Sequence, residues 1–220
     1  MIKTHALAIQ AGAFRLKDID LEVEQGEYVM LMGRTGCGKT TILETICGLR
    51  KVTSGRIELR GRDVTHFKPA ERDIGYVPQD MALFTTMTVR DQLAFGPRIR
   101  KWPESKIETR VGELAQILGI GHLLGRYSKG LSGGERQRVA VGRALAAECG
   151  ILCLDEPLSN LDWKTASALC DLLKSIQALP GVTTLHVSHN ISETERLADR
   201  VFLLEDGRIR EATLDELKAR

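Results

Sequence analysis

The stretch Gly33-Arg-Thr-Gly-Cys-Gly-Lys-Thr-Thr41 follows the apolar run Tyr28-Val-Met-Leu-Met32 and precedes apolar positions at helical spacing. It fits the pattern GxxxxGK[ST], with one additional glycine. Glycines let the backbone close around a polyphosphate, so that N–H groups and the positive end of the next helix face the anion. Lys39 adds charge for the β and γ phosphates, and the Thr40 hydroxyl can ligate magnesium. The residues predicted to hold ATP here are Gly33, Arg34, Thr35, Gly36, Cys37, Gly38, Lys39, Thr40 and Thr41.

The composition of the chain indicates one soluble globular domain. Its 220 residues are 43% hydrophobic, which is enough for a sizeable core. The 31 Lys and Arg and 29 Asp and Glu residues are interspersed, which argues against a nucleic-acid-binding tail or a polybasic membrane anchor. No apolar run approaches the roughly 18 residues that cross a bilayer, and residues 1–12 lack the apolar core of a signal peptide. Five cysteines without CxxC spacing predict reduced thiols. We therefore expect a cytosolic chain with no nucleic-acid partner.

Residue periodicity predicts strands and helices that alternate in the second half of the chain. Alternating stretches predict strands over 5–10, 14–23 and 27–32 and a hairpin over 55–64. A strand ending near Val77 is expected to join that hairpin in an antiparallel part. Helical spacing predicts a helix over 40–48 and a helical stretch from Val89 to Leu124. The remaining predictions are helix 136–148, strand 150–157, helix 164–179, strand 183–189, helix 191–199 and hairpin 200–211. This order predicts an α/β fold with a mainly parallel sheet covered on both faces.

Two acidic residues end the apolar run Ile151-Leu-Cys-Leu154. A buried parallel strand would deliver Asp155 and Glu156 to the carboxyl edge of the sheet, where ligands bind. Asp155 could hold magnesium through its water shell, and Glu156, on the opposite side of the strand, could orient and deprotonate an attacking water. The alternative is turn chemistry, since acids often follow a strand. The glycine stretch upstream favours the catalytic interpretation.

A third segment, Leu131-Ser-Gly-Gly-Glu135, identifies a family. Together with GRTGCGKT, ILCLDEP and the later His189, it closely resembles the ATP-binding cassette ATPases, over essentially the whole chain. The resemblance implies a single domain over 1–220 with a P-loop NTPase (RecA-like) core and an antiparallel β subdomain near the N-terminus. It also implies an inserted α-helical subdomain over about 89–130. In the family the segment binds the γ phosphate through Ser132, Gly133, Gly134 and Glu135 at a helix start, chemistry that a helix N-terminus favours.

The resemblance also implies roles for four single residues. Gln79, in YVPQD, would touch magnesium and the catalytic water and link the core to the helical subdomain. Asp162, ending Ser159-Asn-Leu-Asp162, would lie in the loop that senses a second subunit, and His189 would contact the γ phosphate. The family stacks an aromatic residue on adenine, and Phe14 is the candidate, although it could equally be a core residue. Tyr28 is disfavoured because its strand leads into the core.

The same resemblance implies partners. One copy of each motif predicts a homodimer in which Leu131–Glu135 of one chain faces the glycine stretch of the other, closed by ATP and released by hydrolysis. The apolar run from Met81 to Val89 resembles part of the groove for a coupling helix of a transmembrane permease, or packs within the subdomain. Residues 69–89 look like the import group serving sugars, polyamines and oxyanions, and residues 12–28 like molybdate and tungstate importers. A solute-binding protein and a location on the cytoplasmic face of the membrane are then expected.

One departure from that import group is expected to matter. The chain stops at Arg220, so we expect no C-terminal regulatory domain, which weakens the oxyanion assignment. A soluble cassette ATPase acting on DNA or ribosomes is the alternative, although the sequence holds no charged heptad run of the kind those proteins insert. A binding module without hydrolysis is opposed by the presence of both Asp155 and Glu156.

Overall fold

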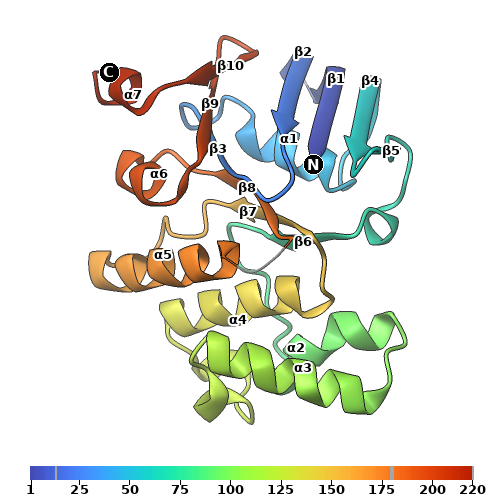
Figure 1. Cartoon of the computed structure of the whole chain (residues 1–220), viewed down its shortest axis with the longest axis vertical. Helices are drawn as coiled ribbons and strands as arrows, with labels where there is room; N and C mark the ends of the chain where they lie inside the picture. The colour runs from blue at the N-terminus through green and yellow to red at the C-terminus, as the bar shows by residue number, and fades with distance from the viewer. Residues whose placement is uncertain (13, 179–180, 220) are drawn as a thin grey trace.

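Two β-sheets and a set of helices are stacked in layers in the computed structural model, which describes residues 1–12, 14–178 and 181–219 (Figure 1). The central sheet has six strands in the order β10-β9-β3-β8-β7-β6, and all neighbours are parallel except the antiparallel pair β9 and β10. Its strands are β3 (Tyr28–Met32), β6 (Ile74–Val77), β7 (Ile151–Asp155), β8 (Thr183–Val187), β9 (Arg200–Glu205) and β10 (Arg208–Ala212). Every residue of β3, β7 and β8 is buried, as expected for parallel strands covered on both faces.

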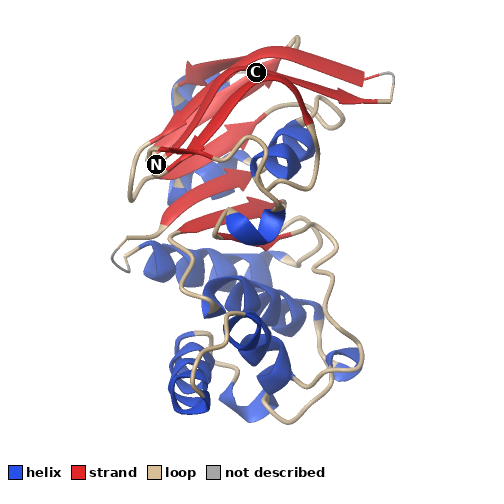
Figure 2. Cartoon of the chain, turned by 90° about the vertical axis from the view of Figure 1, so that its right-hand side faces the viewer, coloured by secondary structure: helices blue, strands red, loops and turns tan. Residues whose placement is uncertain are grey.

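The second sheet is antiparallel, in the order β2-β1-β4-β5. Its strands are β1 (Ile2–Ala11), β2 (Phe14–Val23), β4 (Val52–Leu59) and β5 (Arg62–Asp63). Figure 2 shows this sheet at one end of the molecule, with the central sheet next and helices at the other end. The predicted strands near the N-terminus and the predicted hairpin are therefore confirmed.

The placement of β6 corrects one prediction. We expected this strand in the antiparallel part, but it pairs in parallel with β7, from Ile74 opposite Ile151 to Val77 opposite Leu154. Its alternating burial fits either sheet, so the pattern could not decide. Packing decides instead, because Gly75 lets a helix approach: a Cβ there would lie 2.4 Å from the carbonyl oxygen of Ala144.

Helices cover both faces of the central sheet, as predicted (Figure 1). Val29 and Leu31 of β3 face α1 and the antiparallel sheet, whereas Met30 and Met32 face the cluster built by the other helices. The helices are α1 (Lys39–Ile46), α2 (Val89–Ile99), α3 (Glu104–Ile117), α4 (Gly133–Ala146), α5 (Trp163–Gln177), α6 (Ile191–Leu197) and α7 (Leu214–Lys218). Short 3-10 turns occur at Pro69–Glu71, Gly121–Leu123 and Ser128–Gly130. α7 was not predicted, and residue 179, the predicted end of the helix that forms α5, lies outside the described residues.

Helices α2 and α3 with the two later 3-10 turns form the predicted helical region, packed on α4. Among the described residues, no helix has the length and apolar character needed to span a membrane.

Candidate functional site

The glycine loop, residues Gly33–Gly38, joins β3 to α1 at the carboxyl edge of the central sheet. Gly38 has a φ of 109°, and a Cβ there would lie 2.7 Å from the ring of Phe14. A Cβ on Gly33, whose φ is 151°, would lie 2.6 Å from the carbonyl oxygen of Leu204. Residues with a side chain are therefore excluded from both ends of the loop, which explains why glycine occupies these two positions.

Lys39 fixes the shape of this loop. Its side chain is almost fully buried, and Nζ donates hydrogen bonds to the carbonyl oxygens of Gly33 (2.8 Å) and Arg34 (3.1 Å). An ammonium has three N–H groups, so one remains for a ligand. Gly38 caps α1 without a side-chain hydrogen bond, which leaves the first N–H groups of the helix for an anion.

A hydroxyl and a carboxylate meet beside the loop. Thr40 Oγ1 donates to Asp155 Oδ1 at 3.0 Å, joining α1 to the end of β7. Burial raises the pKa of Asp155, against the opposing effects of the Thr40 hydrogen bond and the Lys39 charge. These two oxygens fit Mg²⁺, which is usually held by one or two protein oxygens together with phosphates and water. Gln79 lies exposed in the turn after β6, at the same edge of the sheet.

Glu156 and His189 lie at the ends of neighbouring strands and contact each other. Glu156 Oε1 is 3.2 Å from His189 Nδ1, and the imidazole is half exposed. The backbone N–H of Glu156 donates to the Val187 carbonyl oxygen at 2.9 Å, and its φ of 44° is unusual for a residue other than glycine. The chain thus holds the carboxylate in a sparsely populated backbone conformation, of the kind that concentrates at functional sites.

Sequence reasoning missed a third acid beside this pair. Glu193 is buried in the first turn of α6, and its Oε2 accepts a hydrogen bond from Ser188 Oγ at 2.6 Å. Ser188 Oγ in turn accepts from the backbone N–H of Asn190 at 3.1 Å, so the two residues that flank His189 belong to one network. Burial raises the pKa of Glu193. The available signal was an acid four residues after His189, in the first turn of a helix.

The segment Leu131–Glu135, which we call the signature segment, starts α4. Ser132 is the N-cap, with its Oγ accepting from the Glu135 N–H (3.3 Å) while Glu135 Oε2 accepts from the Ser132 N–H (2.7 Å). This capping box leaves the other N–H groups of the first turn, including those of Gly133 and Gly134, without a side-chain partner. The arrangement suits an anion at the helix start.

The signature segment packs against the first turn of α5, which Asp162 caps. A Cβ on Gly134 would lie 2.4 Å from Thr165 Cγ2, so this glycine is required for the approach of α4 to α5. Asp162 caps α5, with Oδ1 accepting from the N–H groups of Lys164 and Thr165 at 3.1 Å each. If the start of α4 moves, the start of α5 must therefore move with it.

The two helix starts that suit phosphate lie on opposite sides of the central sheet. α1 packs on the side of the antiparallel sheet, and α4 packs on the other side with α5 (Figure 1). Both open toward the left in Figure 1, where the parallel strands end. One chain consequently presents these two helix starts on separate sides of the sheet.

Arg143 of α4 binds the loop that follows Gln79. Its guanidinium donates to the carbonyl oxygens of Ala82 (2.9 Å) and Met81 (3.2 Å), both of which have positive φ. The same guanidinium lies 5.0 Å from the centre of the Phe84 ring. The helix that starts at the signature segment is thus tied to the predicted magnesium contact.

An apolar groove of about 370 Å³ runs between β6 and α2. The rings of Phe84 and Phe95 pack on its wall in a tilted arrangement with centroids 4.8 Å apart, and Ile99 is 66% exposed. Met81 and Leu83 instead pack against the core. Of the predicted groove segment, Phe84 therefore lines the groove, whereas Met81 and Leu83 pack within the protein.

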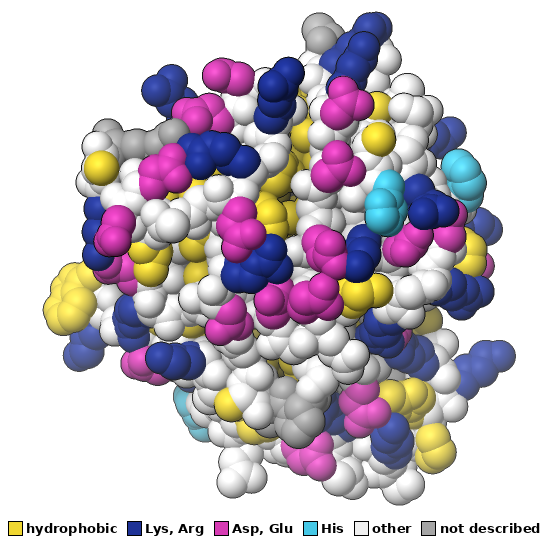
Figure 3. Space-filling view, turned by 45° about the horizontal axis from the view of Figure 1, so that its top comes forward, with side chains coloured by type: hydrophobic (Ala, Val, Ile, Leu, Met, Phe, Trp, Pro, Cys, Tyr) yellow, Lys and Arg dark blue, Asp and Glu magenta, His cyan; other side chains and the backbone are white. Residues whose placement is uncertain are grey.

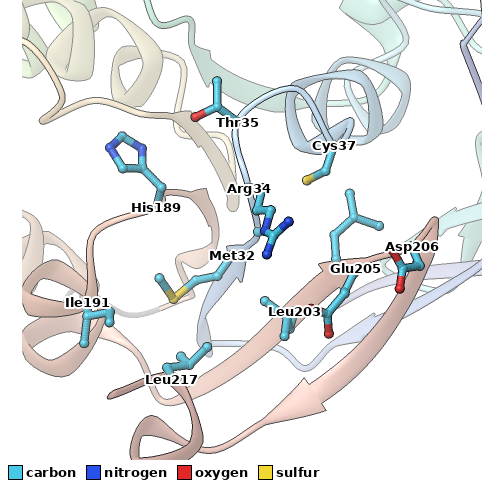
Figure 4. A pocket seen from close by; sticks show the side chains of 12 residues that line it. Met32, Arg34, Thr35, Cys37, His189, Ile191, Leu203, Glu205, Asp206 and Leu217 are labelled. Carbon is cyan, nitrogen blue, oxygen red and sulfur yellow. The ribbon is translucent and has the colours of Figure 1, made fainter. Parts of the chain in front are cut away.

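The aromatic candidates for adenine differ in exposure. Phe14 is half-buried, packs with the core cluster around α1 and touches the glycine loop. Tyr28 is buried and bonds His186 Nδ1 through its hydroxyl at 2.7 Å. A cavity of about 820 Å³ opens on the other side of the loop, between it, α6, α7 and β9 (Figure 4). Phe14 is not among the residues that line that cavity.

Comparisons with known proteins agree with this geometry. The model of a family described as "ABC transporter" matches residues 16–159. The molybdate/tungstate import ATP-binding protein WtpC of Thermococcus kodakarensis is 46% identical over 196 residues, 89% of this chain and 59% of the relative. The sn-glycerol-3-phosphate import ATP-binding protein UgpC of Brucella abortus is 44% identical over 88% of this chain and 55% of its own length. The chain thus spans under two thirds of the length of these relatives.

A solved structure shares the fold over nearly the whole chain. The dimeric post-hydrolysis structure of the ATP-binding cassette MJ0796 bound to ADP and Pi has a TM-score of 0.85, with 29% identity over 97% of this chain and 99% of that one. The fold is accordingly that of a P-loop NTPase with an antiparallel sheet and added helices, as predicted. The family match and these relatives together show that the chain belongs to the ABC transporter family of ATP-binding cassette proteins.

Proposed function

We propose that this chain is the ATP-hydrolysing subunit of an ABC importer. The observation that carries the proposal is the convergence of two pairs, Thr40 with Asp155 and Glu156 with His189, at the sheet edge beside the glycine loop. These are the residue types that phosphoryl transfer to water requires: oxygen ligands for a metal, a base and a second polar group. The relatives WtpC and UgpC are described as import ATP-binding proteins, which supports the assignment.

Binding begins with the phosphates. The backbone N–H groups of residues 33–41 and the start of α1 face the anion, and the free N–H of Lys39 neutralises the β and γ phosphates. Thr40, Asp155 and Gln79 would hold Mg²⁺, which shields charge that develops on the transferred group. Phe14, which lies beside the loop, would contact the base.

Hydrolysis needs an oriented water. The Glu156 carboxylate accepts a proton from that water, and its contact with His189 fixes the direction of the carboxylate. His189, half exposed after the end of β8, would donate a hydrogen bond to the γ phosphate. The Ser188 and Glu193 network holds the backbone on either side of the histidine.

A second copy completes the site. Because the glycine loop and the signature segment lie on opposite sides of the sheet, one chain cannot close both on a single nucleotide. Two copies related by a two-fold axis can, with Ser132, Gly133, Gly134 and Glu135 of each facing the loop of the other. Related cassettes with a TM-score of 0.85 are described as dimeric, which supports a homodimer closed by ATP.

The groove beside Phe84 supports a membrane partner. An amphipathic helix of a transmembrane permease would lay its apolar face against Phe84, Phe95 and Ile99. Arg143 would pass that movement to α4 and the signature segment. The complex would lie at the cytoplasmic face of the membrane and receive a small solute, of the oxyanion class by the likeness to WtpC, from a solute-binding protein.

A soluble cassette ATPase acting on nucleic acid or ribosomes is less well supported. Figure 3 shows acidic and basic side chains interspersed over the visible face, without a basic stripe of the kind that binds a phosphate backbone. The net charge of +2 agrees with that surface. Purification from native membranes with a polytopic protein would support the importer, and recovery with ribosomes or DNA would support the alternative.

The test of the catalytic assignment is Glu156→Gln. This variant should bind ATP with ordinary affinity, hydrolyse it at least about 100-fold more slowly, and accumulate as a dimer in light scattering. Glu195→Gln, at an exposed helix position, is the matched control and should retain the wild-type rate. Normal turnover by Glu156→Gln would remove Glu156 from the role of base.

A further inference from the structure

Trp163 is the most exposed large hydrophobic side chain in the described part of the protein. It is the first residue of α5, directly after Asp162, and is 83% exposed. The other tryptophan, Trp102, packs against the core and lies under Lys106 Nζ, 3.5 Å from its ring centre. Tryptophan is the residue type most enriched among interface hot spots, so a side chain left in water beside the catalytic face points to a partner.

The cavity beside the glycine loop has the chemistry to receive an indole. Figure 4 shows Met32, Ile191, Leu203 and Leu217 grouped along it, with Arg34 above them. Three of these apolar side chains also belong to the main core cluster, so the cavity floor is an open edge of the core. A volume of about 820 Å³ exceeds that of any single side chain.

The exposed tryptophan and the cavity lie on the same side of the molecule. The N-terminal end of α5 projects at the left in Figure 1, where α6 and α7 also lie. In an isologous dimer the same surface of each copy contacts the other copy. A protruding side chain and a cavity on that surface therefore make two equivalent contacts. We propose that, in the ATP-closed homodimer, Trp163 of each copy inserts into the cavity beside the glycine loop of the second copy. This inference rests on the homodimer of the proposed function.

Charges at the two surfaces are complementary. The guanidinium of Arg34 at the cavity can stack on the indole face, an arrangement that arginine and tryptophan favour. Lys164, next to Trp163, is exposed, and in the dimer its charge would meet Asp206, which is exposed at the cavity rim. The inserted side chain would also contact Arg34 and His189, which line the cavity. Dimer closure would therefore act directly on the glycine loop and on the histidine proposed to contact the γ phosphate.

Tryptophan fluorescence tests the insertion directly. In a Trp102→Phe, Glu156→Gln chain, Trp163 is the sole tryptophan. ATP and Mg²⁺ should shift its emission to shorter wavelength as dimer forms, with dimer mass measured by light scattering in the same sample. In the Glu156→Gln background, Trp163→Ala should raise the dimer dissociation constant about 30-fold or more. Leu49→Ala, which truncates another exposed hydrophobic side chain, should leave it unchanged.

Crosslinking locates the partner surface. A Trp163→Cys, Asp206→Cys chain should form a disulfide between copies under mild oxidant only with ATP, because a disulfide requires Cα atoms within about 7 Å. With Cys37, which lines the cavity, replaced by Ser in the same chain, crosslinking by Trp163→Cys alone would show that the two tryptophans meet at the two-fold axis and would overturn the inference. A dimer without an emission shift, unaffected by Trp163→Ala, would overturn it and leave the homodimer standing. Monomers in every sample would overturn both.

Discussion

The stability of the protein should fall steeply below neutral pH because of one buried histidine. His186 is fully buried in β8, where the Tyr28 hydroxyl bonds its Nδ1 at 2.7 Å and its Nε2 has no partner. Desolvation lowers the pKa of His186 from 6.5 to about 3. The other four histidines are exposed.

The sign and size of the effect follow from linkage. Between pH 6.5 and about 3 the unfolded chain binds a proton at His186 and the folded chain does not, so stability is lost as pH falls. At 1.36 kcal/mol for each pH unit, the full gap gives about 5 kcal/mol. From pH 7 to pH 4.5 the histidine alone should remove about 2.7 kcal/mol.

Urea unfolding at pH 7, 6, 5 and 4.5 measures this loss. The comparison variant is His186→Leu with Tyr28→Phe, which removes both polar partners and leaves no unpaired hydroxyl. Wild type should lose about 2.7 kcal/mol more than this double variant between pH 7 and 4.5, while the exposed-site control His122→Gln should follow wild type. If wild type and the double variant lose stability in parallel, His186 does not titrate as described.

Three further outcomes are expected. Arg72→Met should lower the free energy of unfolding by about 3 kcal/mol or more in urea, because the buried guanidinium donates to four backbone carbonyls, two at the end of α1. Arg50→Met, which removes an exposed ion pair, should change it by at most about 1 kcal/mol, and equal losses would contradict this account. Alkylation of Cys37, in the glycine loop, should block ATP binding and be prevented by ATP; unchanged binding after confirmed modification would refute the placement. Glu193→Ala should lower the ATPase rate about 10- to 100-fold and Glu193→Gln much less, whereas equal rates would show that its hydrogen bond does not position the site.

Local chemistry made much of the site predictable. The glycine loop is encoded by its own residues, since only glycine fits beside Leu204 and Phe14 and only a long cation reaches back to the loop carbonyls. The placement of Asp155 and Glu156 followed from an apolar strand ending at the sheet edge. These inferences need only neighbours in sequence and a parallel sheet.

The parts that sequence could not provide depend on contacts between distant segments. β6 looks the same in either sheet, and its partner is set by Gly75 against α4. Glu193 reads as an ordinary acid in the first turn of a helix until Ser188 is seen bonded to it. The short α7 depends on packing of Leu217 against the core.

The contact between α4 and α5 connects the two proposals. Gly134 of the signature segment lies against Thr165, and Thr165 is held by Asp162, the residue before Trp163. The start of α4, which we propose binds an anion, and the exposed tryptophan are therefore joined by direct contacts. When the signature segment of one copy moves toward the phosphate bound by the second copy, Trp163 of the first copy must move with it toward the cavity of the second copy. A single variant such as Trp163→Ala should consequently weaken ATP-driven closure while leaving ATP binding to the monomer intact, a separation that loss of a contact between the glycine loop and the phosphates could not produce.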